Sequence, residues 1–325
     1  MTIKRLVIEN FKSIERIELI EPNPFTVFVG PNGSGKSNIF EALEFMNLAT
    51  KAGGLVANMF GGVEKFVNRK AEKKIILVSA LLDSALLKLV QKPDETNTYN
   101  VIYSETSVET QGKAISRRKN TNQFLINFNH LFIKNNDKVK YNNQADDQLS
   151  LSANNLESVL KRILQNSMLR DEIFEWLGLF VPGFKAVEVD DHDELHWFEE
   201  SSDRYFTKDL ISDGTYYIIA LLTAVYQSDD QPQFLCIEEP ENGLHPQVAR
   251  ELVDFFRLMC EERGHYIWLN THSPYMVSRV KPEELVVVDK VNGATQIKQF
   301  SSGDFDGMRM DDAWLTNALN GGKAW

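Results

Sequence analysis

The chain has 325 residues, of which 43% are hydrophobic and 25% charged, and its formal net charge is −11. This composition is typical of a globular protein with one large domain or two smaller ones. The acidic total argues against indiscriminate wrapping of nucleic acid, and no apolar run reaches the roughly 20 residues that cross a bilayer. The first residues lack the pattern of a signal peptide, and the two cysteines lack the spacing of a metal site or a disulfide framework. We therefore expect a cytoplasmic protein without a membrane segment.

Short runs rich in β-branched and aromatic residues open the chain. They predict strands at 3–8, 14–20 and 25–29, with 14–20 as the second arm of a hairpin. A glycine-rich loop follows the third strand, and residues 37–49 have helical character. Strand, glycine-rich loop and helix form the context that a phosphate-binding loop requires.

The middle of the chain differs in character from its surroundings. Residues 75–83 predict a strand, whereas eight asparagines between 120 and 143 indicate exposed or mobile connections. Apolar residues then recur at spacings of three and four, which predicts a helix over 154–178. Short strands are expected within 184–207. We interpret 85–207 as an inserted α+β lid or arm.

A strand–helix pattern resumes after this insert. The pattern predicts helices at 214–227 and 247–262 and strands at 234–239, 265–270 and 284–289. Alternation of this kind indicates a mixed, mostly parallel sheet flanked by helices. The expected α/β fold is a P-loop ATPase fold that combines residues 1–84 with residues 208–325.

Residues 30–37 read GPNGSGKS and match the phosphate-loop pattern G-x-x-x-x-G-K-[ST] at every fixed position. Glycines let the backbone approach the β-phosphate, Lys36 brings a positive charge to the β- and γ-phosphates, and the Ser37 hydroxyl is a Mg²⁺ ligand. The residues expected to bind the nucleotide here are Gly30, Pro31, Asn32, Gly33, Ser34, Gly35, Lys36, Ser37 and Asn38.

Polar residues follow two of the later strands. Glu238 and Glu239 end the apolar run FLCIEE, where the first acid can hold Mg²⁺ and the second can polarise an attacking water. An exposed acidic strand end is the alternative interpretation of this pair. His272 comes directly after the strand 265–270 and can donate a hydrogen bond to a γ-phosphate, although a lone histidine is more often structural.

A second anion site precedes the helix 214–227. Ser212, Asp213 and Gly214 offer a hydroxyl, a backbone N–H and a helix N-terminus to a phosphate. One nucleotide bound by one subunit does not need two phosphate-binding sites, so the second site calls for an explanation.

The order of these motifs resembles that of the ATP-binding-cassette (ABC) ATPase family. A phosphate loop, a long insert, Ser-x-Gly before a helix, Glu-Glu-Pro after an apolar strand and a histidine after the next strand follow one another. The opening IKRLVIENFKSIERIEL is similar to the SMC-like branch, which includes recombination and repair ATPases, and the chain resembles most closely the stand-alone bacterial "AAA family" ATPases. Many of these ATPases occur beside a nuclease or another effector in anti-phage defence or toxin–antitoxin-like systems.

The resemblance implies that ATP and Mg²⁺ are the cofactors and that two subunits form a head-to-tail homodimer, alone or within a higher oligomer. Ser212 and Gly214 would contact the γ-phosphate of ATP held by the opposing subunit, and Asn242–His245 would cross the interface. Two ATP molecules between the subunits would account for the second anion site.

The same resemblance implies a role for individual polar residues. Glu239 is the expected catalytic base and His272 the γ-phosphate sensor, with Lys36 as the cation that acts on the phosphates. Asn10, Lys12 and Ser13 are expected near the base, the ribose or the α-phosphate of the nucleotide.

The sequence departs from the family pattern at three places. The metal-associated acid is usually Asp but here is Glu238, and the usual Ser-Gly-Gly signature has Asp213 at its centre. No glutamine is evident for the loop that couples the site to the lid. By its position in the chain, the segment 61–69 is the expected lid-coupling loop, and Glu64 and Asn68 are the candidate residues within it.

Three functions compete for this set of motifs. The first is an ATPase whose ATP-driven dimerisation controls a partner effector, such as a nuclease or toxin, or a DNA-bound state. The second is the nucleotide-binding subunit of a transporter, against which the opening NFKS pattern and the signature both argue. The third is a small-molecule kinase, although Glu239 and His272 suit the activation of water better. Phosphate release from ATP without an acceptor separates the first function from the third.

Two clusters lie outside the motifs. Asp190–Glu194 has metal-binding residue types but is better interpreted as a solvated turn. The segment after 284–289 is too short for a nuclease domain, so any such activity is expected on a partner chain. Basic residues that form either a DNA-contacting patch or a solvated surface of mixed charge are Lys113, Arg117, Arg118, Lys119, Lys134, Lys138 and Lys140.

Overall fold

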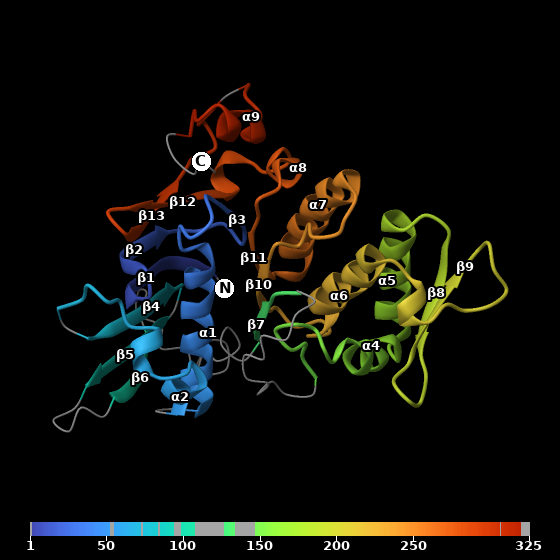
Figure 1. Ribbon diagram of the computed structural model, residues 1–325, viewed down its shortest axis with the longest axis horizontal. Helices are drawn as coiled ribbons and strands as arrows, with labels where there is room; N and C mark the ends of the chain where they lie inside the picture. The colour runs from blue at the N-terminus through green and yellow to red at the C-terminus, as the bar shows by residue number, and fades with distance from the viewer. Residues whose placement is uncertain are drawn as a thin grey trace.

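The computed structural model describes residues 2–52, 55–72, 74–83, 85–93, 99–107, 127–133, 147–305 and 307–319. In this part of the chain two large β-sheets lie on either side of one long helix, and further helices cover the far face of the six-stranded sheet (Figure 1).

A six-stranded sheet forms the centre of the molecule. Its strand order is β13-β12-β3-β11-β10-β7, and every neighbouring pair except β12 and β13 is parallel. This order confirms the predicted mixed, mostly parallel sheet. The strands are β3 (Phe25–Val29), β7 (Phe128–Leu131), β10 (Phe234–Glu238), β11 (Tyr266–Asn270), β12 (Leu285–Val291) and β13 (Ala294–Gln299).

The second large sheet is antiparallel and has the order β2-β1-β4-β5-β6. Its strands are β1 (Ile3–Phe11), β2 (Ile14–Ile20), β4 (Ile76–Leu82), β5 (Ala85–Pro93) and β6 (Tyr99–Ser107). The predicted hairpin of the first two strands is confirmed. β5 and β6 belong to the expected insert 85–207 yet pair within this sheet, and β7 pairs within the central one. The domain boundaries at 84 and 207 stay a prediction.

Helix α1 (Lys36–Ala52) fills the space between the two sheets. Successive side chains of a strand point to opposite faces, so each central strand contributes to two layers. Phe28 packs edge-on against Phe40 of α1, with ring centroids 5.5 Å apart. Its neighbours Val27 and Val29 face the opposite side. Burial on both faces explains why the central strands read as unbroken apolar runs.

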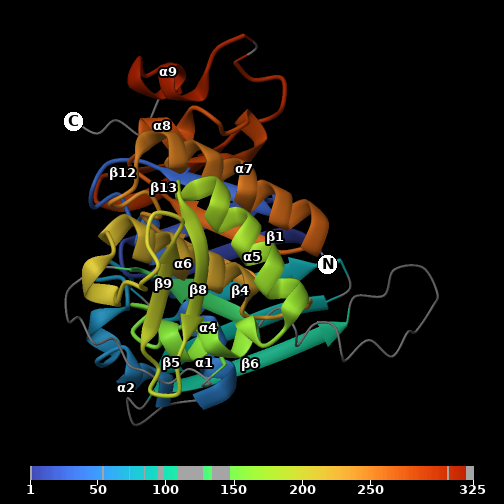
Figure 2. The same cartoon turned by 90° about the vertical axis from the view of Figure 1, so that its right-hand side faces the viewer.

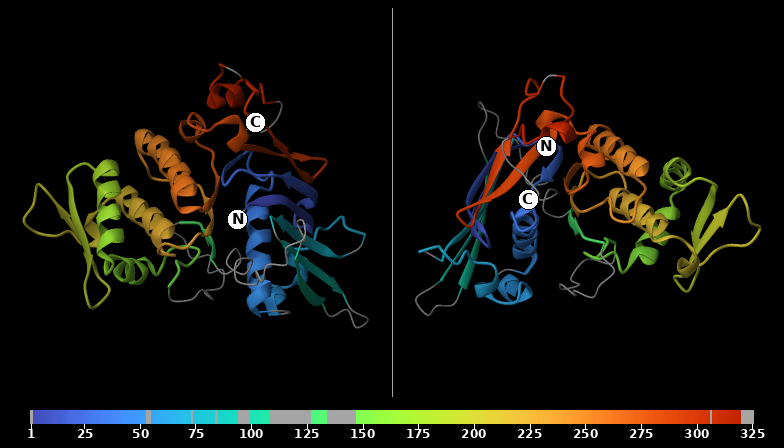
Figure 3. Two further views of the ribbon diagram at one scale, coloured as in Figure 1. Left: turned by 180° about the vertical axis from the view of Figure 1, so that it is seen from behind. Right: turned by 45° about the horizontal axis from the view of Figure 1, so that its top comes forward.

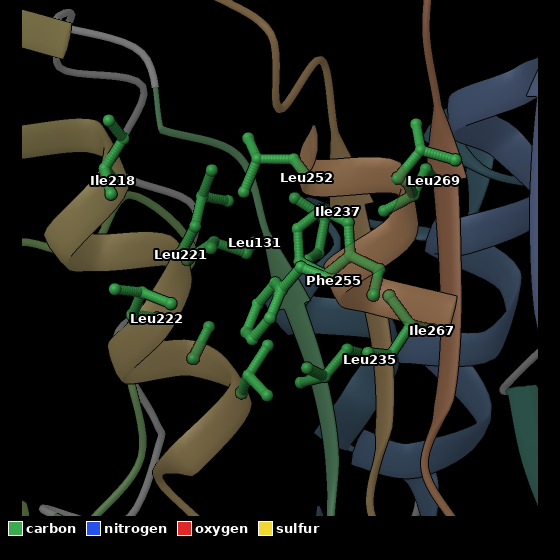
Figure 4. Packing of buried hydrophobic residues seen from close by; sticks show 14 of the residues in the cluster. Leu131, Ile218, Leu221, Leu222, Leu235, Ile237, Leu252, Phe255, Ile267 and Leu269 are labelled. Carbon is green, nitrogen blue, oxygen red and sulfur yellow. The ribbon is translucent and has the colours of Figure 1, made fainter. Parts of the chain in front are cut away.

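The other face of the central sheet is covered by α6 (Asp213–Tyr226) and α7 (Pro246–Arg263). Figure 4 shows Leu221 of α6 and Phe255 of α7 close to Ile237 of β10. α6 is apolar around most of its circumference because another layer of the chain packs on its outer side.

That outer layer consists of two helices and a β-hairpin. Figure 2 shows α5 and the hairpin nearest the viewer, in front of α6, and Figure 3 shows the same order of layers from behind. The elements are α4 (Leu156–Leu164), α5 (Ser167–Phe180), β8 (Phe184–Val189) and β9 (Leu195–Glu199).

Short elements complete the described chain. They are α2 (Val56–Met59), α8 (Pro274–Val277), α9 (Met310–Leu315) and the 3₁₀ turns η2 (Val63–Lys65), η3 (Lys208–Leu210) and η4 (Pro282–Glu284). None of the helices among the described residues is long and apolar enough to cross a membrane.

Two sequence-based predictions of secondary structure were wrong. The helix expected over 154–178 is instead two helices, α4 and α5. The chain breaks between them at Asn166, whose side chain caps the N-terminus of α5 by accepting from the backbone N–H of Met168 at 3.1 Å. A strand was expected at 203–207, but only Phe206 forms a bridge there, to Trp197 of β9.

The asparagine-rich stretch was also misjudged in part. Residues 120–126 and 134–143 lie outside the described residues, but β7 between them is a buried strand. Its polar side chains are paired: Asn129 donates to the carbonyl oxygen of Leu149 at 2.8 Å, and both ring nitrogens of His130 contact carboxylates. These contacts offset part of the cost of burying the two side chains, which composition alone does not reveal.

His265 lies fully buried just before β11, and its Nδ1 accepts a hydrogen bond from the backbone N–H of Gln233 at 3.3 Å. Burial and, to a smaller extent, the nearby positive charge of Arg263 lower the pKa of His265 to about 4. As the pH falls, His265 therefore takes up a proton in the unfolded chain before it does so in the folded chain. The neutral, buried His265 contributes fully to the free energy of unfolding above about pH 6.5, and this contribution declines towards pH 4.

We expect His265→Gln, which keeps an acceptor for Gln233, to lose this part of the pH dependence. Between pH 7 and pH 5 the free energy of unfolding should fall by about 2 kcal/mol less in the variant than in the wild type. Urea unfolding at the two pH values measures the difference. Equal falls in both proteins would show that His265 does not resist protonation.

Candidate functional site

The phosphate loop connects β3 to α1, and its path requires glycine at two positions. A Cβ atom at Gly30 would lie 2.0 Å from the carbonyl oxygen of Val288 in β12. A Cβ atom at Gly35 would lie 2.1 Å from Thr295 Oγ1 in β13, and Gly35 has a φ of 108°, which other residues rarely adopt. The loop therefore runs directly against β12 and β13, and the positive N-terminal end of α1 borders the pocket in front of it.

Lys36 lies buried inside this loop. Its Nζ donates to the carbonyl oxygen of Gly30 at 2.8 Å and to that of Pro31 at 3.2 Å. Burial lowers the pKa of Lys36 to about 8, although the carboxylates of Glu239 and Glu238 act in the opposite direction. A phosphate beside Lys36 would supply the close negative charge that compensates for this burial.

Ser37 and Glu238 meet where β10 ends. The Ser37 hydroxyl donates to Glu238 Oε2 at 2.7 Å, and Asn270 Nδ2 lies 3.5 Å from the same hydroxyl. Hydroxyl and carboxylate oxygens are ligands that Mg²⁺ prefers, so these residues fit the predicted ion. The extra methylene of Glu238 relative to Asp does not stop its carboxylate from reaching Ser37.

The second oxygen of Glu238 is held by His130, which the sequence analysis missed. His130 Nε2 lies 2.9 Å from Glu238 Oε1, and Nδ1 lies 2.9 Å from Glu44 Oε2 on α1. Burial alone would lower the pKa of His130, but the two hydrogen-bonded carboxylates raise it to about 9. Burial alone would raise the pKa of Glu238, but the hydrogen bond with His130 lowers it to about 2. Glu238 is therefore ionised at neutral pH.

Glu239 turns into the same pocket. It adopts a positive φ of 49° directly after β10, and its backbone N–H donates to the carbonyl oxygen of Asn270 at 2.9 Å. Asn242 Nδ2 donates to Glu239 Oε2 at 2.9 Å. A carboxylate held in this way beside a buried cation can accept a proton from an attacking water.

The turn that carries His272 is fixed by Glu241. Glu241 Oε1 accepts from the Thr271 hydroxyl at 2.6 Å and from the backbone N–H of His272 at 3.0 Å. Burial raises the pKa of Glu241. This carboxylate orients the backbone of the turn, and the His272 side chain lines the pocket.

A pocket of about 200 Å³ collects the predicted side chains at the carboxyl ends of the parallel strands. It is lined by Ser13, Asn32, Gly33, Gly35, Lys36, Ser37, Asn38, Glu239, Asn270, His272 and Lys290. Gly30, Pro31 and Ser34 belong to the loop but do not line it. Asn270 and Lys290 line the pocket but were not predicted to do so. Asn270 ends the strand that precedes His272, whereas no sequence signal marks Lys290.

Lys12 and Ser13 differ in their relation to the pocket. Ser13 lines the pocket, where its Oγ accepts from Asn38 Nδ2 at 2.7 Å and lies 2.6 Å from Thr295 Oγ1. Lys12 forms an ion pair with Glu41 of α1 and does not line the pocket. Nucleotide contacts of both residues stay predictions.

The signature residues lie elsewhere in the subunit. Ser212 caps α6, and its hydroxyl accepts from the backbone N–H of Thr215 at 3.0 Å. A Cβ atom at Gly214 would lie 2.7 Å from the carbonyl oxygen of Gly243, so the start of α6 touches the predicted interface segment. The described residues that line the pocket do not include Ser212, Asp213 or Gly214.

The candidates for the lid-coupling loop are not brought to the pocket either. Asn68 Oδ1 accepts from the backbone N–H of Lys70 at 2.8 Å, and Glu64 forms an exposed ion pair with Lys74 at 3.1 Å. Neither Glu64 nor Asn68 lines the pocket.

The acidic cluster forms the predicted turn between β8 and β9. Asp190 Oδ1 accepts from the backbone N–H groups of His192 at 2.8 Å and Glu194 at 2.9 Å. His196, which the sequence analysis did not single out, lies 3.9 Å from Asp190 Oδ2. Asp190, Glu194 and His196 have the spacing of metal ligands, but the hydrogen bonds of Asp190 explain the turn by themselves.

The basic residues considered for DNA contact all lie outside the described residues. They are Lys113, Arg117, Arg118, Lys119, Lys134, Lys138 and Lys140.

Two protein families match the chain. Residues 1–173 match the family described as "AAA ATPase domain", and residues 92–278 match the family described as "AAA domain, putative AbiEii toxin, Type IV TA system". Each match covers more than half of the 325 residues.

Curated relatives match a short part of the chain. The chromosome partition protein Smc of Methanocaldococcus jannaschii is 44% identical over 70 residues, which are 22% of this chain and 6% of that protein. The DNA replication and repair protein RecF of Mannheimia succiniciproducens is 44% identical over 46 residues, 14% of this chain and 13% of that protein. The matched region is thus a small fraction of these relatives' length.

Solved structures of Smc heads match almost the whole chain. An Smc head bound to the C-winged helix domain of ScpA gives a TM-score of 0.64 at 15% identity, covering 93% of this chain and 98% of the other. The SMC head domain from Thermotoga maritima gives 0.55 at 16% identity, covering 93% and 100%. The fold is that of an SMC-like head, which confirms the predicted fold class.

Proposed function

The chain belongs to the family of AAA ATPase domains, and from this premise we propose that it binds ATP with Mg²⁺ and hydrolyses it. The observation that carries the proposal is that Lys36, Ser37, Glu239 and His272 line one pocket and that Glu238 is hydrogen-bonded to Ser37 beside it. A phosphate loop, a metal-binding pair, a base and a second phosphate contact are what phosphoryl transfer to water requires.

Each residue has a distinct role in this proposal. Lys36 and the loop N–H groups would hold the β- and γ-phosphates, and Ser37 and Glu238 would hold Mg²⁺, which would supply positive charge beside the phosphates. Glu239 takes the proton of the attacking water, and His272 donates to the γ-phosphate.

We further propose that hydrolysis requires a head-to-tail homodimer. The support is the separation of two phosphate-binding devices within one subunit: Ser212 and Gly214 stand at the start of α6, apart from the residues that line the Lys36 pocket. Gly214 lies against Gly243 of the Asn242–His245 segment, so the two predicted interface elements lie side by side. ATP binding would then join two subunits and hydrolysis would release them.

The dimer is proposed to control a partner effector, a nuclease or toxin, or a DNA-bound state, in anti-phage defence or DNA repair. Support for a partner comes from the toxin–antitoxin wording of one matched family and from the Smc head that binds a ScpA domain. A reducing cytoplasmic setting is part of the proposal, supported by two buried free cysteines, Cys236 and Cys260.

The test is release of inorganic phosphate from ATP by the purified chain with Mg²⁺ and no acceptor, followed by light scattering with and without ATP. Phosphate release and an ATP-dependent dimer are expected. A chain that releases no phosphate alone but phosphorylates an added acceptor would be a kinase, and the proposal would then fail.

Ser212→Arg is expected to leave ATP binding by the monomer within about twofold of wild type and to abolish the ATP-dependent dimer, since a bulky side chain would fill the facing phosphate site. Light scattering and titration of a fluorescent ATP analogue measure the two properties. Asn166→Arg is the matched control, because it removes the cap of α5 in the same way without touching the proposed interface. A dimer that persists in Ser212→Arg would rule out the proposed sandwich.

A further inference from the structure

His130 is a buried side chain that joins three elements of the fold. It lies on β7 with 2% of its side chain exposed, between Glu238 at the end of β10 and Glu44 on α1. Each ring nitrogen lies 2.9 Å from one carboxylate oxygen. The ring therefore bridges the two acids.

The bridge leaves Glu238 with one orientation. His130 holds Oε1, and Oε2 accepts from the Ser37 hydroxyl at 2.7 Å. A glutamate has one more rotatable bond than an aspartate, and each freely rotating bond must be ordered before the carboxylate can bind a metal. Contacts at both oxygens remove that freedom before an ion arrives.

We propose that His130 is a positioning residue that aims the Glu238 carboxylate at the Mg²⁺ site. The inference rests on the proposed function and deepens it by naming how this chain works with a glutamate as its metal-associated acid. Outer partners that orient a metal ligand typically account for about 10- to 100-fold in metal affinity or activity.

Glu44 is the anchor on the other side of the ring. Its Oε2 holds Nδ1, and the ring packs edge-on against Phe40 with centroids 5.9 Å apart, so α1 fixes both the tilt and the rotation of the imidazole. Since α1 begins with the phosphate loop, the same helix carries Ser37 and orients Glu238 through His130. The two metal-binding oxygens therefore keep one spacing.

A purely structural ion pair makes a different prediction from a positioning residue. If His130 only stabilised the packing of β7, its loss would lower the stability of the fold and leave the Mg²⁺ requirement of the remaining folded protein unchanged. The Mg²⁺ requirement is thus the readout that separates the two roles.

The experiment titrates a fluorescent ATP analogue into the full chain, first in EDTA and then at increasing Mg²⁺. The variants are His130→Phe, which keeps a ring and removes both donors, and His130→Gln, which keeps one amide donor. His265→Phe is the matched control, because it removes another buried histidine, just before β11, that does not line the pocket. Far-ultraviolet circular dichroism reports whether each variant is folded.

We expect His130→Phe to raise the Mg²⁺ concentration for half-maximal binding by about 10- to 100-fold, while affinity in EDTA changes by less than about twofold. His130→Gln should recover part of the loss, and His265→Phe should keep the wild-type Mg²⁺ requirement. If His130→Phe does not fold, a raised Mg²⁺ requirement in folded His130→Gln carries the same conclusion.

A wild-type Mg²⁺ requirement in every folded His130 variant would overturn the inference and leave the proposed ATPase intact. A wild-type chain that binds no nucleotide at any Mg²⁺ concentration would overturn both.

Discussion

Glu239→Gln is expected to lower the rate of ATP hydrolysis by at least about 100-fold while ATP affinity stays within about threefold of wild type. The carboxylate lies in the pocket beside Lys36, and its Oε2 accepts from Asn242 Nδ2 at 2.9 Å. An amide of the same shape can keep that hydrogen bond through its oxygen but cannot take a proton from water. The variant should therefore still bind ATP but should lose most of its hydrolysis.

Trapped ATP then gives a second readout of the same variant. Since hydrolysis is proposed to release the dimer, Glu239→Gln with ATP and Mg²⁺ should stay dimeric in light scattering long after the wild type has returned to monomer. The control is Glu262→Gln, the same change at an exposed position near the end of α7, which should hydrolyse ATP as the wild type does. Near-normal turnover by Glu239→Gln would remove Glu239 from the role of base.

Local sequence patterns predicted the parts of the site whose chemistry needs fixed residue types at short spacing. GPNGSGKS could be identified because wrapping a phosphate requires glycine, lysine and a hydroxyl within one turn of chain. Glu239 and His272 could be identified because both follow buried strands, and parallel strands bring such ends to one edge of a sheet. The helix expected at 247–262 is Pro246–Arg263 for a similar reason, since its apolar face repeats locally.

Contacts between distant parts of the chain could not be predicted in this way. His130 and Glu238 are 108 positions apart, and Ser13 and Thr295 are 282 apart. No spacing rule connects such pairs, because only the strand order of the sheet brings β7 beside β10. A histidine among asparagines reads as part of a polar connection until its two carboxylate partners are known.

The insert shows the same limit at the level of the fold. The sequence suggested an inserted lid or arm from residue 85, and the first strand of that segment, β5, pairs with β4 from Ile76 opposite Gln91 to Leu81 opposite Leu86. Composition reports how exposed a segment is expected to be, whereas hydrogen-bonded pairing depends on neighbours that the sequence does not name.

Lys36→Ala is expected to weaken ATP binding by about 100-fold, which corresponds to about 3 kcal/mol for hydrogen bonds between a charged donor and a phosphate. The ammonium also donates to Gly30 and Pro31 in the loop, so its removal leaves two carbonyl groups without their donor. Lys36→Met keeps most of the apolar stem and loses only the charged end. Similar losses in both variants would attribute the effect to charge and not to packing.

Titration of a fluorescent ATP analogue at saturating Mg²⁺ measures these affinities, with Lys185→Ala on the exposed face of β8 as the control for a lost lysine. Because Lys36 belongs to the binding step and Glu239 to the chemical step, the two sets of variants should separate: Lys36→Ala should fail to dimerise with ATP, and Glu239→Gln should fail to dissociate. A Lys36→Ala chain that binds ATP as tightly as the wild type would mean that the nucleotide phosphates lie outside this loop, and the roles proposed for Ser37 and Glu238 would fail with it.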